Sequence, residues 1–324
     1  MNIKIFIKIF IALISIILLN KYNFLDFSYL LKLDIYLSIK IIGIVFLIMI
    51  LGSIKWYFLI IIQNNNISFK QVLESYYLGY ALNYVLFGIA GDIIKTIYLI
   101  KGKKNKIGIS MSVVIDRLIG LFSMFLLMVI CFPKIIEYSS DFSNFNTPIT
   151  DNLFKYYSIV FLSFFFLCIL IKKILNSRRI NKIIFLYFYR YKNNTFRIIS
   201  KTIKVLFSYR KSSLYLLYNL ISAMLLQIII AFSIFIICTY VINFEISYFN
   251  NLVSSLVVQI ISIVPLSPGN IGVGEAAFSQ IMYILNNNIL LQYATVYFIF
   301  RIFNMLCSIP GVIIYYLVIR KRVY

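Results

Sequence analysis

Residues 213–242 read SLYLLYNLISAMLLQIIIAFSIFIICTYVI, a run without a single charged side chain. A helix needs about 20 apolar residues to cross the hydrocarbon core of a bilayer. The run therefore predicts a membrane-spanning helix. Five further apolar runs predict spans of the same kind, at 3–20, 38–62, 109–133, 154–175 and 290–318. The predicted fold class is all-α, a polytopic membrane helix bundle with about six full spans.

The composition excludes several other classes of protein. The 324 residues are 62% hydrophobic and 13% charged, with a mean hydropathy of +0.95, which leaves too little polar surface for a soluble domain. There is no histidine, and none of the four cysteines forms a CxxC pair. We therefore expect no metal site and no cofactor. The net charge is +21, and the basic residues lie between the apolar runs. We therefore expect anionic lipid headgroups, not nucleic acid, as partners.

Two further apolar stretches are interrupted. Residues 75–100 break around Gly88, Gly91 and Asp92, and residues 249–288 break at PLSPGNIGVGE, residues 265–275. Two prolines and three glycines within eleven residues cannot continue a helix. Unpaired backbone at membrane depth is tolerated only where it lines a cavity or is buried in protein. Both stretches therefore predict re-entrant helical hairpins.

The distribution of charge sets the expected topology. The outer loops hold most acidic residues and few basic ones only if the N-terminus is cytoplasmic and both hairpins turn back on the side they entered. The cytoplasmic side then receives Lys70, Lys101, Lys103, Lys104, Lys106, the basic segment 172–211 and the tail Arg320–Arg322. We predict a protein of the bacterial inner membrane with both termini in the cytoplasm. Within the segment 172–211, we expect residues 178–207 to form a helix in the inner interface, either as an anionic-lipid contact or as a loop that fixes orientation.

This layout relates the two halves of the chain. Residues 1–133 and 154–318 each predict the order span, span, hairpin, span, and the two hairpins open from opposite sides. Such inverted repeats are typical of secondary transporters. We therefore predict one transmembrane domain over residues 1–324, built from two inverted halves.

Burying an ionisable side chain in the hydrocarbon core of a membrane costs free energy, so such residues within apolar segments indicate function by default. Asp92 and Lys95 are three residues apart, so they share one face of a helix. They form either one wall of a polar cavity or an ion pair at the membrane interface. Asp116 and Arg117 diverge on their helix, so each needs a partner elsewhere, unless both lie at headgroup depth. For Arg117 that partner is a phosphate or the carboxylate of Glu275. Three lysines near span ends are expected to snorkel to the headgroups: Lys40, Lys55 and Lys155.

Glu275 opens the second half of the broken stretch 249–288. It either caps that helix, or serves as a proton or cation site, or pairs with Arg301 or Arg117. The free N–H groups of a half-helix suit a phosphate. Arg301 lies inside the last span, where its planar fork suits either a carboxylate or a phosphate.

These pieces together resemble one known family. In order they are Asn83, then GDIIK at 91–95, SVVIDRLIG at 112–120, PLSPGNIGVGE at 265–275, and Arg301. The sequence resembles the flippase-like transmembrane domain of lysylphosphatidylglycerol synthases over nearly the whole chain. It departs from the family in lacking a proline after Asn83 and in having Lys95 where arginine is usual. The chain ends at Tyr324, just after the last span, so we expect a stand-alone member without the soluble aminoacyltransferase domain.

The resemblance implies movement of an anionic or lipid-linked headgroup across the membrane. The candidate cavity residues are Asn83, Asp92, Lys95, Asp116, Arg117, Pro265, Pro268, Gly269, Gly272, Gly274, Glu275 and Arg301. Two alternatives are a membrane-embedded glycosyl- or phospholipid-transferase and a non-transporting partner of an envelope-biosynthesis enzyme. No catalytic constellation favours the transferase, and nothing in the sequence selects an oligomeric state.

Overall fold

The computed structural model of the chain describes a defined set of residues and two compact units. The described residues are 14, 17, 21, 25–31, 33–63, 66–85, 90–101, 105–140, 201–203, 205–209, 212–242, 246–264, 266–286 and 292–323. One unit comprises residues 1–124 and 217–324, and the other comprises residues 125–216. All secondary structure in the described residues is helical.

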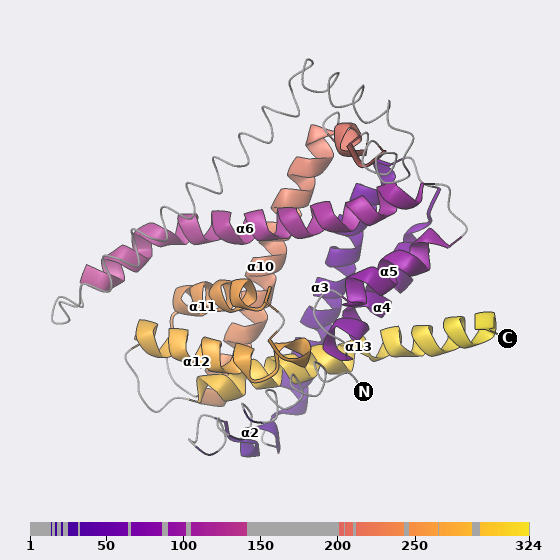
Figure 1. Cartoon of the computed structure of the whole chain (residues 1–324). Helices are drawn as coiled ribbons and strands as arrows, with labels where there is room; N and C mark the ends of the chain where they lie inside the picture. Colours follow the sequence, from indigo (N-terminus) through magenta and orange to yellow (C-terminus); the bar gives the residue numbers. More distant parts are fainter. Residues whose placement is uncertain are drawn as a thin grey trace. The chain divides into compact units, whose positions relative to one another are not determined.

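Within the described residues, four helices are long and apolar enough to cross a membrane. They are α3 (Ile35–Ile61), α6 (Lys106–Ser140, apolar as far as Cys131), α10 (Ser213–Ile242) and α13 (Tyr293–Val323) (Figure 1). At 1.5 Å per residue, the 27 residues of α3 extend about 40 Å, more than the thickness of the hydrocarbon core. These helices match four of the predicted spans and confirm a helical membrane bundle. The predicted spans 154–175 and, except for residues 14 and 17, 3–20 lie outside the described residues.

The first interrupted stretch forms two packed helices, α4 (Phe69–Val85) and α5 (Ala90–Ile100), side by side in Figure 1. The Ser75 hydroxyl on α4 donates to the Lys95 carbonyl on α5 at 2.6 Å, and the Gly91 N–H donates to Asn83 Oδ1 at 3.1 Å. The predicted break includes Gly91 and Asp92, but both belong to the first turn of α5. Gly88 lies outside the described residues.

The second interrupted stretch also forms two packed helices, joined by a short irregular segment. Helix α11 (Tyr248–Ile261) is followed by the 3₁₀ turn η1 (Pro268–Asn270) and by α12 (Val273–Asn286). Gly269, Asn270 and Gly272 have φ angles of 56°, 54° and 84°. This left-handed backbone is accessible to glycine and tolerated by asparagine, so the glycines allow the chain to reverse here.

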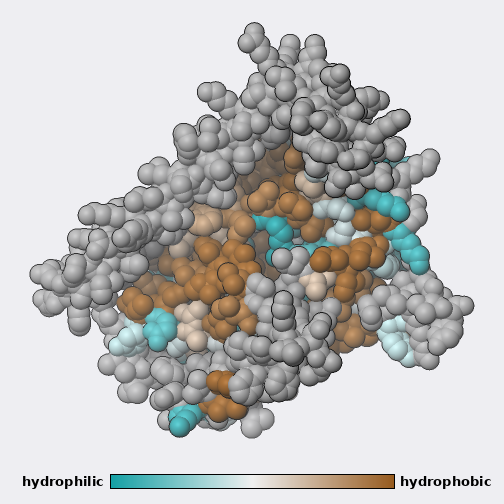
Figure 2. Space-filling model, in the orientation of Figure 1, coloured by the Kyte–Doolittle hydropathy of each residue, from teal (hydrophilic) through white to brown (hydrophobic). Residues whose placement is uncertain are grey.

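Helix α4 lies at the centre of the larger unit, packed against α3, α5, α13 and η1. Its contact with α13 is close at Gly311, where a Cβ would collide with the Tyr77 carbonyl oxygen. A buried apolar cluster joins α3, α10, α12 and α13, and a second one around Trp56 joins α3 to α6. Figure 2 shows that most coloured residues on one face are hydrophobic, with few hydrophilic residues among them.

The smaller unit, residues 125–216, is described only in part. It holds the C-terminal part of α6, with buried Leu127, Met128 and Cys131, and the helical residues 201–203 and 205–209. Most of the basic segment 172–211 lies outside the described residues. The inverted relation of the two halves and the re-entrant character of the hairpins stay predictions.

Candidate functional site

Five ionisable side chains from α3, α5 and α6 form a cluster, which we call the α5 charge cluster: Lys55, Asp92, Lys95, Asp116 and Arg117. Asp92 lies at its centre. Its Oδ1 faces the Lys95 ammonium at 2.7 Å, and its Oδ2 accepts from Arg117 Nε at 2.6 Å and contacts Arg117 Nη2. Asp92 also lies in the first turn of α5, where the helix dipole favours a carboxylate.

The cluster carries a surplus positive charge, because three cations face two carboxylates. The side chains of Asp92 and Lys95 are 6% and 7% exposed, whereas that of Arg117 is 59% exposed. The surplus charge is therefore accessible chiefly at Arg117.

Aromatic side chains enclose the buried part of the α5 charge cluster. The Lys95 ammonium lies 4.6 Å from the ring centroid of Trp56 and 5.4 Å from that of Tyr76, in cation–π geometry. Trp56 is fixed in turn by donating from Nε1 to the Ser112 hydroxyl at 3.1 Å. The ring centroid of Tyr76 lies 6.4 Å from that of Trp56. The aromatic rings thus hold Lys95 in place while leaving Arg117 exposed.

Lys55 is a member that sequence reasoning missed. The sequence predicts that Lys55 snorkels to the headgroups, and this is wrong, because the residue is 8% exposed and pairs with Asp116 Oδ1 at 3.0 Å. Its backbone carbonyl also accepts from Asn219 of α10 at 2.9 Å. The partner of Asp116 depends on which faces of α3 and α6 meet, and a single sequence does not show that.

A second group lies where the tips of the two hairpins meet, which we call the hairpin-tip cluster: Tyr80, Tyr84, Glu275, Tyr297, Arg301 and Asn304. Glu275 is fully buried. Its Oε2 accepts from the Gly272 N–H at 2.7 Å, and its Oε1 faces Arg301 Nε at 3.3 Å. The carboxylate therefore both caps α12 and pairs with Arg301, two of the alternatives that the sequence leaves open.

The hairpins touch at Tyr84 and Gly269. A Cβ on Gly269 would lie 3.4 Å from the Tyr84 carbonyl oxygen, so η1 packs directly on the end of α4. On the same helix, the Tyr80 hydroxyl donates to Asn304 Oδ1 of α13 and lies 3.4 Å from the Tyr84 hydroxyl.

The structure divides the predicted cavity residues between these groups. Asp92, Lys95, Asp116 and Arg117 lie in the α5 charge cluster, and Glu275 and Arg301 lie in the hairpin-tip cluster with Gly272 and Gly274 beside them. Arg117 pairs with Asp92, not with Glu275. Asn83 fixes the start of α5, Gly269 contacts Tyr84, and Pro268 begins η1. Pro265 lies outside the described residues.

The tyrosines of α4 are the second feature that sequence reasoning missed. Tyr76, Tyr80 and Tyr84 are spaced four residues apart, so they share one face of the helix. Adjacent ring centroids are 6.5 and 5.4 Å apart. We call this row the tyrosine ladder, and its i, i+4 spacing is the signal in the sequence that could have revealed it.

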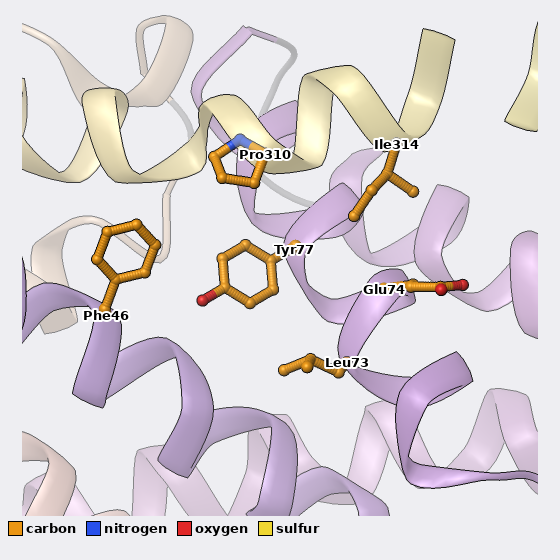
Figure 3. A pocket seen from close by; sticks show the side chains of 6 residues that line it. All are labelled: Phe46, Leu73, Glu74, Tyr77, Pro310 and Ile314. Atoms are coloured by element: carbon orange, nitrogen blue, oxygen red, sulfur yellow. The ribbon is translucent and has the colours of Figure 1, made fainter. Parts of the chain in front are cut away.

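An apolar groove of about 290 Å³ lies beside α4 (Figure 3). Its lining residues come from α3, α4 and α13: Phe46, Leu73, Glu74, Tyr77, Pro310 and Ile314. Glu74 is the charged residue among them, and it accepts from the Tyr98 hydroxyl of α5 at 2.9 Å. An apolar lining of this kind suits an alkyl chain.

Comparison with known proteins identifies the class of protein. A family model described as lysylphosphatidylglycerol synthase TM region matches residues 5–311. The chain belongs to this family and is a multi-pass integral membrane protein of lipid metabolism. Comparison with curated proteins and with solved structures gives no match.

Proposed function

We propose that the protein is a translocator that moves an anionic phospholipid, or another phosphate-bearing lipid-linked headgroup, across the bacterial inner membrane in cell-envelope biogenesis. The observation that carries this proposal is the exposed guanidinium of Arg117 at the edge of a buried cluster with a surplus positive charge. In the predicted topology both termini are cytoplasmic, and the protein's partners are membrane lipids.

The charge of the α5 charge cluster matches that of a phosphodiester. Such a group carries one negative charge, which would neutralise the surplus left by Lys55, Lys95 and Arg117 against Asp92 and Asp116. The planar fork of arginine binds two phosphate oxygens at once. Asp92 holds Nε and Nη2 of Arg117 and so orients the guanidinium toward an incoming headgroup.

The arrangement of the hairpins supports a path for the headgroup. Their tips meet at Tyr84 and Gly269, next to a buried arginine. The acyl tails stay in the lipid, with one tail able to enter the apolar groove beside Tyr77. Rocking of the two inverted halves would expose the headgroup to each side in turn.

Binding is favoured over acid–base catalysis by the state of the carboxylates. Asp92, Asp116 and Glu275 each face a cation within 3.3 Å. A general acid or base needs a carboxyl free to exchange a proton with substrate. The three carboxylates instead orient cations, which is the task of a binding site.

The test uses purified protein in liposomes that contain a fluorescent anionic phospholipid, with dithionite added outside to quench accessible probe. Wild type is compared with Arg117→Gln and with Lys40→Gln. The Lys40 control removes one exposed cation that contacts the Tyr36 ring of α3 and no carboxylate in the described residues. We expect movement in wild type and Lys40→Gln, and a loss of about tenfold in Arg117→Gln. Equal movement in all three proteins, or none in wild type, would contradict the proposal.

A further inference from the structure

Arg301 has a buried guanidinium nitrogen that donates no hydrogen bond within the described residues. The residue is 6% exposed, and its Nη1 has no hydrogen-bond partner among the described residues. Its Nε faces Glu275 Oε1 at 3.3 Å, and its Nη2 lies against Gly274. A buried guanidinium N–H without an acceptor is costly. Pairing with Glu275 alone therefore does not account for this side chain.

The surroundings of Arg301 suit an oxyanion. Gly274 lies in the first turn of α12, a 14-residue helix whose N-terminus favours negative charge. The Tyr84 hydroxyl lies 3.4 Å from the Tyr80 hydroxyl, a long contact, and can turn to donate to an oxygen atom. A guanidinium, a helix N-terminus and a phenol are all donors that bind phosphate oxygens.

The tyrosine ladder connects this place with the α5 charge cluster. At one end the Tyr76 ring lies 5.4 Å from the Lys95 ammonium. At the other end Tyr84 packs against Gly269, and the Tyr80 hydroxyl donates to Asn304, which is one turn from Arg301 on α13. The eight steps from Tyr76 to Tyr84 rise about 12 Å along α4. Three phenols on one helix face thus lie between the exposed arginine and the buried one.

We infer that Arg301 Nη1 and Tyr84 form a second, buried site for a phosphate oxygen, reached from Arg117 along the tyrosine ladder. The route rests on the proposed function, which supplies the headgroup at Arg117. The binding site itself rests on the unused donor of Arg301. As the phosphate arrives, it competes with Glu275 for Arg301, and Glu275 keeps its bond to the Gly272 N–H.

The test measures thermal unfolding of the full chain in detergent, in an Arg117→Gln background that removes the exposed site. Ligands are sodium phosphate, compared with sodium chloride at equal ionic strength, and phosphatidylglycerol in mixed micelles. The comparison variant adds Arg301→Gln and Glu275→Gln together, so that no unpaired charge is buried. We expect saturating ligand to raise the midpoint by about 3 °C in Arg117→Gln and not at all in the comparison variant.

The outcomes separate the ligand sources. A rise with sodium phosphate shows that free phosphate enters the site, and a rise with phosphatidylglycerol alone shows that the headgroup must come on a lipid. No rise with either, or equal rises in both variants, would overturn the inference. Adding Tyr84→Phe to the Arg117→Gln background should reduce the rise, and an unchanged rise would overturn the role of Tyr84. The liposome comparison of Arg117→Gln with wild type is independent, so the proposed function and the buried site can fail separately.

Discussion

The guanidinium of Arg301 fills the space in front of Gly274, because a Cβ on Gly274 would lie 2.5 Å from Arg301 Nη2 and 3.0 Å from Tyr297 Cε1. Arg301 therefore occupies space that a side chain at position 274 would need. Gly274, in the motif at 265–275, leaves room for Arg301 of the last span, which is 27 residues further along the chain.

Gly274→Ala should displace Arg301 from Glu275. We expect a loss of about 1–3 kcal/mol in the free energy of unfolding and slower lipid movement in liposomes. The matched control is Gly43→Ala on α3, where a Cβ would meet nothing within 4 Å. That change should leave stability equal or raise it by about 0.5–1 kcal/mol. Equal unfolding midpoints for the two variants would show that Arg301 yields without cost.

The sequence predicts the spans well, because a long apolar run has few other structures open to it. The runs 38–62, 109–133, 213–242 and 290–318 all appear as long helices, with ends shifted by a few residues. The second break is also where it is predicted, since Gly269 and Gly272 adopt positive φ angles that end a helix, whereas Gly91 and Asp92 of the first predicted break belong to α5. These features depend on local sequence alone.

The partners of the charged residues are harder to predict from the sequence. Asp92 and Lys95 pair as their spacing indicates, because an i, i+3 contact needs only a helix. The pairs of Lys55 with Asp116 and of Arg117 with Asp92 join different helices. Their formation depends on how α3, α5 and α6 rotate against one another, which hydropathy does not encode.

Lys55 and Asp116 form a buried ion pair. Removing one partner should cost more stability than removing both. Lys55→Met alone leaves the Asp116 carboxylate buried without its cation and should cost about 3–5 kcal/mol of stability. Lys55→Met combined with Asp116→Leu removes both charges and should recover most of that loss. Denaturant unfolding of the two single variants and the double variant measures the coupling. Additive effects would show that the two side chains do not interact.

Asn270 holds the irregular segment between α11 and α12. Its Oδ1 accepts from the Leu266 N–H at 3.2 Å, its Nδ2 donates to the Ser262 carbonyl at 2.6 Å, and its φ is 54°. Asn270→Gly loses both bonds but keeps the backbone relaxed, so it should cost about 1–2 kcal/mol. Asn270→Ala adds strain at positive φ and should cost about 1 kcal/mol more. The reverse order of unfolding midpoints would contradict a role for the backbone conformation.

The apolar groove offers a test of where an acyl tail lies. Ile314→Trp should fill the groove beside Phe46 and Tyr77 and exclude the tail (Figure 3). The control is Ile313→Trp, which adds the same ring at the neighbouring residue of α13. Ile313 is already 52% exposed and does not line the groove. We expect Ile314→Trp to slow movement of a long-chain fluorescent phospholipid about tenfold, since burial of part of the tail in the groove is worth about 1–2 kcal/mol.

A short-chain analogue too short to enter the groove should move at equal rates in both groove variants, because neither variant changes the proposed headgroup path along α4. Both rates come from the same liposome assay. Equal slowing of long-chain and short-chain lipids by Ile314→Trp would instead mean that the added ring disturbs the packing of α4 on α13, where Gly311 already contacts the backbone of Tyr77. A tail site in the groove therefore requires that the slowing depend on chain length.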